Sequence, residues 1–185
     1  DASGTQLSLR GARANSGLMP VGVATLTGGG AILAAGGSSG GGRLVNLDNT
    51  IYLDSAFFGL WDGRWENYGA LRGRGGNSSL YIRGTSSINR GLISSGVLTH
   101  FQMVGSGGPQ TPVLLDNAGG LIESVGNSSI TLENCLIHGG AINATFGRVI
   151  AHGGGAVTLR DVSITGDKLE TGCGSIRSSI SPLSR

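Results

Sequence analysis

The sequence predicts an all-β solenoid, in which short strands and tight turns stack as successive coils. The stretch Ile130–Gly140, ITLENCLIHGG, returns in altered form 27 residues later as VTLRDVSITG at Val157–Gly166. Apolar residues alternate in both copies as in half-buried strands, and the preceding Asn or Asp suits a turn. No window shows sustained helical periodicity. A strand–turn–strand unit that recurs at an interval is typical of stacked repeats.

The aligned copies predict which side chains stack inside the solenoid. We expect each pair to form an aliphatic ladder between adjacent coils, about 4.8 Å apart. The predicted pairs are Leu132 with Leu159, Cys135 with Val162, and Ile137 with Ile164. Cys135 is then a small core residue, while a bridge from Cys135 to Cys173 stays open.

The composition fits a chain of tight turns and excludes several classes of protein. The 185 residues include 36 glycines, with 38% hydrophobic and 13% charged residues, so neither disorder nor a collagen repeat is expected. A net charge of +2 predicts no nucleic-acid partner, and no apolar run is long enough for membrane insertion. Lys168 is the only lysine. Because lysine normally protects exposed strand edges, its scarcity favours burial in an oligomer, although a GC-rich genome also explains it.

The repeated stretch resembles the coils of right-handed parallel β-helix proteins such as pectate lyases, phage tailspikes and autotransporter passengers. A GGA-aliphatic pattern at 29–32, 139–142 and 154–157 is similar to repeats of autotransporter and chlamydial outer-membrane passengers, whose Phe-x-x-Asn motif is missing. The resemblance implies an all-β, right-handed parallel β-helix of about five coils with a distinct N-terminal segment. A β-sandwich is the alternative. This fold hosts binding, cleavage and structural roles alike.

The chain divides into three parts. Residues 1–42 are expected to hold two short strands, Gln6–Arg10 and Val21–Thr27, and a glycine-rich linker or cap. Residues 43–167 form the β-helix. Residues 168–185 are polar and serine-rich, and we expect them to form a C-terminal tail that is extended or lies on a neighbour.

The sequence contains no convincing motif for catalysis or metal binding. Gly36–Gly40 matches the G-x-S-x-G nucleophile elbow, but no helix follows. His100, His138 and His152 lie in separate segments without the spacing of zinc ligands, so no metal and no cofactor are predicted. Glycoside hydrolysis needs two placed carboxylates. The candidates Asp54, Asp62, Glu66, Asp116, Glu123, Glu133 and Asp161 do not cluster. We therefore predict no catalytic residue, and the question of an enzyme stays open, leaning towards none.

The aromatic segment at 57–68 is the best candidate for ligand or subunit contact. It contains Trp61, Arg64, Trp65 and Tyr68, which are the types enriched at interfaces and suited to stacking on sugars. A hydrophobic plug at the start of the solenoid is the structural alternative.

These observations predict a non-enzymatic structural or attachment component of a virion, such as a tailspike, tail fibre or capsid-decorating protein. We expect a homotrimer that contacts other virion proteins and a host-surface glycan, located in the virion or outside the cell. A secreted adhesin or passenger fragment is the alternative, and a polysaccharide lyase or hydrolase is the third hypothesis.

Overall fold

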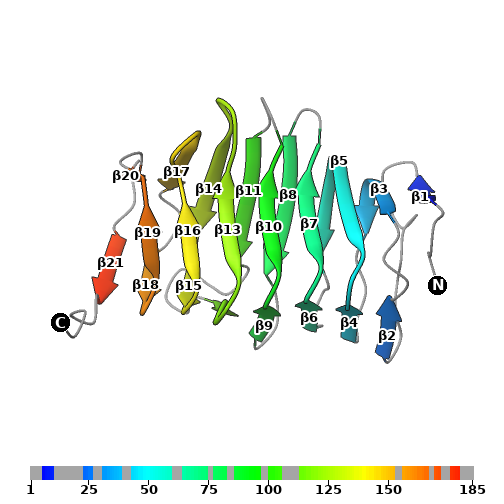
Figure 1. The fold of residues 1–185 in the computed structure, drawn as a ribbon, viewed down its shortest axis with the longest axis horizontal. Coiled ribbons are helices and arrows are strands. Elements are labelled where there is room, and N and C mark those ends of the chain that lie inside the picture. The colour runs from blue at the N-terminus through cyan, green and yellow to red at the C-terminus, as the bar shows by residue number, and fades with distance from the viewer. Residues whose placement is uncertain are drawn as a thin grey trace.

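A computed structural model of the chain is an all-β parallel solenoid (Figure 1). The structure describes residues 6–10, 23–26, 31–38, 43–59, 64–74, 77–82, 86–96, 100–105, 113–152, 156–166, 169–171 and 176–179. Side chains are described at 45–52, 65–74, 87–96, 100, 102–103, 113–152, 156–166 and 170. No helix occurs in these ranges, so they contain no helix that could cross a membrane.

One side of the solenoid is a sheet of eight parallel strands. In spatial order these are β2 (Val23–Leu26), β4 (Arg43–Asn46), β6 (Arg64–Asn67), β9 (Ser86–Asn89), β12 (Val113–Asp116), β15 (Cys135–His138), β18 (Val157–Arg160) and β21 (Ile176–Ser179).

The other sheet has two faces, which are joined because the long strand β5 (Thr50–Gly59) pairs with β7 through its first residues and with β8 through its last. The front face continues through β7 (Ala70–Gly73), β10 (Leu92–Ser95), β13 (Leu121–Ser124), β16 (Ala141–Asn143) and β19 (Ser163–Thr165). The back face continues through β8 (Asn77–Ile82), β11 (His100–Gly105), β14 (Ser129–Glu133), β17 (Arg148–Ala151) and β20 (Leu169–Thr171). At the other end, β3 (Ala31–Ser38) pairs with β5, and β1 (Gln6–Arg10) pairs with β3.

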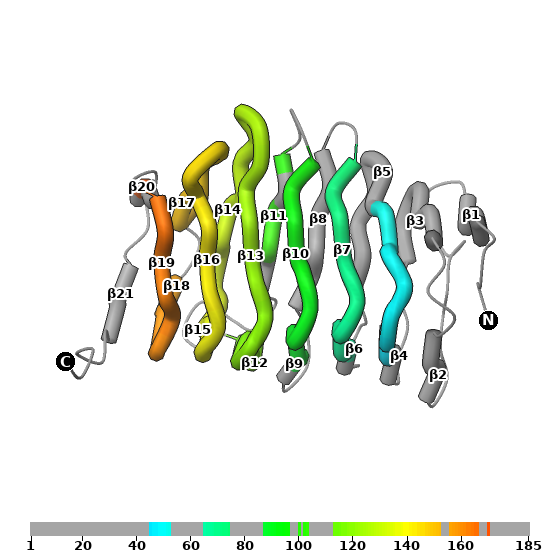
Figure 2. Tube along the Cα trace, viewed as in Figure 1, coloured from blue at the N-terminus to red at the C-terminus, as the bar shows by residue number. Residues whose placement is uncertain are grey.

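Each coil passes in turn through the eight-stranded sheet, the front face and the back face. Figure 2 follows this path along the Cα trace, with successive coils side by side. About four turns separate β6 from β18, close to the five coils expected. The predicted all-β parallel β-helix is therefore confirmed, while its right-handed winding stays a prediction.

Aliphatic side chains from all three faces fill the interior. Ile122 on the front face, Ile130 on the back face and Ile137 on the eight-stranded sheet are each 0% exposed. Cys135 is buried among them as a free thiol, which confirms its predicted place in the core. Burial raises the pKa of this thiol to about 12.

The predicted ladder pairs are wrong in register. Leu132 stacks on Ala151, Cys135 on Val113, and Ile137 on Leu159. The coil repeat at this place is the 22 residues from Ile137 to Leu159, whereas the repeated stretches are offset by 27.

The error has a physical cause in two similar corners. Asn134 (φ 49°) lies between β14 and β15, and Asp161 (φ 54°) lies between β18 and β19. Asn and Asp tolerate this left-handed conformation better than other non-glycine residues. The two copies therefore share a kind of corner, but they occupy different corners of the cross-section.

Strand pairing extends into both predicted end segments. Within residues 1–42, β2 pairs with β4, and β3 includes Gly36 and Gly37 of the glycine-rich stretch that was predicted as linker or loop. Within 168–185, β20 pairs with β17 and β21 with β18. The domain boundaries at 42 and 167 stay predictions.

Candidate contact surface

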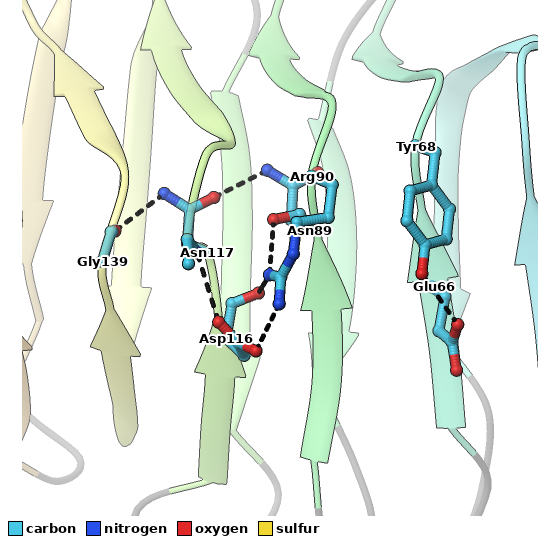
Figure 3. Close-up of polar contacts among 8 residues, drawn as sticks. Glu66, Tyr68, Asn89, Arg90, Asp116, Asn117 and Gly139 are labelled. Carbon is cyan, nitrogen blue, oxygen red and sulfur yellow. Dashed lines mark hydrogen bonds and ion pairs between the residues drawn. The ribbon is translucent and has the colours of Figure 1, made fainter.

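A ladder of four buried asparagines runs inside the corner between the eight-stranded sheet and the front face. Asn46 Nδ2 donates to Asn67 Oδ1 at 2.8 Å, and Asn67 Nδ2 donates to Asn89 Oδ1 at 2.8 Å. Asn89 Nδ2 donates to Asn117 Oδ1 at 2.7 Å, and Asn117 Nδ2 donates to the Gly139 carbonyl at 3.2 Å (Figure 3). All four asparagine side chains lie in residues that are at most 2% exposed.

Each ladder amide also donates a hydrogen bond to a backbone carbonyl of its own corner. Asn67 Nδ2 donates to the Gly69 carbonyl and Asn89 Nδ2 to the Gly91 carbonyl, both at 3.2 Å. The glycines are required by close packing, because a Cβ on Gly91 would lie 2.0 Å from the Gly69 carbonyl oxygen. Successive coils therefore hold these corners rigidly against one another.

The residue after each asparagine points away from the core. Leu47 and Tyr68, which follow Asn46 and Asn67, are each 44% exposed, and Arg90 follows Asn89 half-buried. We define the corner surface as Leu47, Tyr68, Arg90 and Asp116. Glu66 lies beneath it, 3% exposed.

Two polar contacts organise the corner surface (Figure 3). The Tyr68 hydroxyl donates to Glu66 Oε2 at 3.3 Å, and Arg90 Nη2 lies 2.6 Å from Asp116 Oδ2. Arg90 Nη1 also donates to the Asp116 carbonyl at 3.0 Å, so the guanidinium bridges two coils. The hydrogen bond from Arg90 is the main cause that lowers the pKa of the Asp116 carboxyl, and the same bond raises the pKa of Arg90.

Acidic and basic side chains alternate along this corner. The carboxylates of Glu66 and Asp116 both contribute to raising the pKa of Arg90. Further along the axis, His138 Nε2 lies 3.5 Å from Asp161 Oδ2. A charged row of this kind, beside an exposed Tyr68 and Leu47, suits contact with a polar partner that also offers apolar surface.

Proton transfer is a poorer match for this surface than contact. Asp116 is held as an anion by Arg90, which opposes a role as general acid at neutral pH. Among the residues with described side chains, no group of three His, Cys, Asp or Glu could hold a metal ion. His100, for example, contacts Ser129 Oγ through Nδ1 at 2.7 Å.

The structure separates the residues predicted for ligand or subunit contact. Tyr68 lies on the corner surface, whereas Trp65 is 2% exposed and belongs to the hydrophobic core, where it is in register with Leu44. Arg64 begins β6, but its side chain lies outside the described residues, as does all of Trp61.

Arg90, Asp116 and Leu47 were not predicted as contact residues. A signal for Arg90 exists in the sequence, because Asn67-Tyr-Gly and Asn89-Arg-Gly repeat at the 22-residue coil interval. The middle residue of each tripeptide is the one that points outward. The next corner, Asn117-Ala-Gly-Gly, is longer and hides the pattern.

The chain is a parallel β-solenoid in which hydrogen bonds between buried asparagines connect successive coils at one corner. Comparisons with protein-family models, with curated proteins and with solved structures found no match.

Proposed function

We propose that the protein is a non-enzymatic structural or attachment component of a virion, of the tailspike, tail-fibre or capsid-decorating kind. The observation that carries the proposal is the corner surface, where Tyr68 and Leu47 are exposed above the buried asparagine ladder. A rigid scaffold lowers the entropic cost of binding because its contact residues are already in place. The proposed partners are further copies of the chain in a homotrimer, other virion proteins and a host-surface glycan.

The corner surface matches glycan or protein contact by its chemistry. Tyrosine offers an apolar ring together with a hydroxyl, and here Glu66 fixes that hydroxyl. The Arg90–Asp116 pair adds donors and acceptors within reach of the same corner, and both side chains keep about a third of their surface exposed. Such residues form contacts without any rearrangement of the backbone.

Light scattering on the purified protein tests the assembly, and a glycan array tests the ligand. We expect a mass of three chains, whereas a single chain would favour the adhesin or passenger alternative. Tyr68→Ala should lower glycan binding or the oligomeric mass. Phe146→Ala is the matched control, because Phe146 is 66% exposed on another corner.

Two results would overturn the proposal. The first is an unchanged mass and unchanged glycan binding in Tyr68→Ala, which would remove the corner surface from any contact. The second is turnover of an acidic polysaccharide, measured as new reducing ends, that disappears in Asp116→Asn. That result would establish an enzyme instead.

A further inference from the structure

The outer surface of the front face carries an aliphatic stripe, formed by Ala70, Leu92, Leu121 and Ala141. These residues are in register on β7, β10, β13 and β16, which lie side by side across the front of the solenoid (Figure 1). Their chain neighbours, such as Ile93 and Ile122, point into the core, so the stripe residues point outward. All four are half-buried. This short aliphatic row on an outer face can pack against another apolar surface.

A second row beside the stripe carries opposite charges on the two sides of β10. Arg72 on β7 and Glu123 on β13 flank Ser94 on β10, and Ser94 itself is only 1% exposed, so the two half-buried charged side chains form the outer surface here. They are two strands apart, or about 9.6 Å between Cα atoms. Neither side chain forms an ion pair with any residue in the described part of the chain.

This arrangement is self-complementary about β10. A two-fold axis that runs along β10, between two facing copies, exchanges β7 with β13 and β5 with β16. Arg72 of each copy then faces Glu123 of the other, which gives two ion pairs per contact. Small residues also face larger ones, since Ala70 meets Leu121.

We propose that two copies of the chain associate through their front faces about this axis, with their solenoid axes antiparallel. A second copy is the occupant because the charge pattern on one side of β10 is the complement of the pattern on the other. The contact goes beyond the proposed function. It buries the front face and leaves the back face free, and it borders the corner surface, because Tyr68 and Arg90 lie two residues before Ala70 and Leu92. A homotrimer that also used this contact would contain six chains.

The contact is small. The front-face strands from β5 to β19 span about 24 Å along the axis, and the front-face part of each, three or four residues, is about 10–13 Å long. The area of the front face enclosed by these two lengths is smaller than the area that stable complexes bury. We therefore expect a dissociation constant no tighter than the micromolar range.

Analytical ultracentrifugation of the full chain, at concentrations up to about 1 mM, tests the proposal. The wild-type mass should rise with concentration to an even number of chains. Arg72→Glu places like charges together twice and should weaken association at least about tenfold. The double variant Arg72→Glu/Glu123→Arg restores both pairs and should recover the wild-type constant.

Arg160→Glu is the matched control, because it makes the same change of charge on the exposed outer side of β18. It should leave the association constant unchanged. Three outcomes would overturn the contact: a wild-type mass independent of concentration, a failure of the double variant to recover, or an equal loss in Arg160→Glu. A constant mass of three chains would remove this contact and leave the proposed homotrimer intact.

Discussion

Replacement of Asn89 by alanine tests whether the asparagine ladder holds the corner together. The Asn89 amide makes three hydrogen bonds. It accepts from Asn67 Nδ2 at 2.8 Å and donates to Asn117 Oδ1 at 2.7 Å, both buried, and it donates to the part-buried Gly91 carbonyl at 3.2 Å. Because alanine cannot replace any of them, all three are lost at once.

The expected cost follows from these contacts. Three hydrogen bonds at about 1 kcal/mol each give about 3 kcal/mol, and Asn117 Oδ1 loses the one donor seen for it. An unsatisfied buried acceptor costs roughly 1–3 kcal/mol, although part of this already counts in the lost bond. We therefore expect Asn89→Ala to lower the free energy of unfolding by roughly 3–5 kcal/mol.

Urea denaturation followed by far-ultraviolet circular dichroism measures this change. Asn143→Ala is the control, because Asn143 is half-buried and its Oδ1 accepts from the exposed Thr145 amide at 3.0 Å. We expect the control to lose less than about 1 kcal/mol. If Asn89→Ala lost no more than Asn143→Ala, the ladder would not be a source of stability and this reasoning would be refuted.

Three other changes test the core and the corner surface. Ile137→Asp should prevent folding, because an unpaired carboxylate at this 0% exposed position costs several kcal/mol. Circular dichroism measures the loss of structure. A folded variant would contradict the coil register. Native Cys135 should resist a maleimide at pH 8 and react after denaturation, since burial raises its thiol pKa to about 12. Mass spectrometry of the Cys135 peptide measures the labelling. Rapid labelling of the native protein would show an open core. The Arg90–Asp116 pair should stabilise the fold by less than about 1 kcal/mol. Because the folded pKa of Asp116 is lowered, this stability is present above the usual value of 3.8 and is lost as the pH falls through the folded pKa. Asp116→Asn should remove that part of the acid dependence in urea midpoints, and an unchanged profile would count against the pair.

The fold class was predictable because corner chemistry is local. Asn134 and Asp161 each take a left-handed φ between two strands, so both corners need a similar short run of residues. The register was not predictable from the same copies, since the sequence does not show that they occupy different corners. The strand pairing, such as that of Ile137 with Leu159, reveals the coil interval at this place.

The corner surface was only partly predictable for a related reason. The aromatic segment crosses from strand β6 into a corner, so Trp65 turns into the core while Tyr68 turns outward. Composition alone treats both as contact residues. Ladder spacing also varies, with 22 residues from Asn67 to Asn89 and 28 from Asn89 to Asn117. A search for a fixed interval therefore misses the ladder.

The buried asparagines also explain how a chain with interchangeable aliphatic ladders keeps one register. Leucine, isoleucine and valine can replace one another inside a solenoid, so apolar stacking alone tolerates a slipped coil. An asparagine cannot slip, because each amide needs both a corner carbonyl and the next amide in line. A slipped Asn89 would leave buried polar groups unpaired on two coils, at a cost of several kcal/mol. Tyr68 and Arg90 directly follow ladder residues, so the register that the ladder specifies also sets which side chains the corner surface presents.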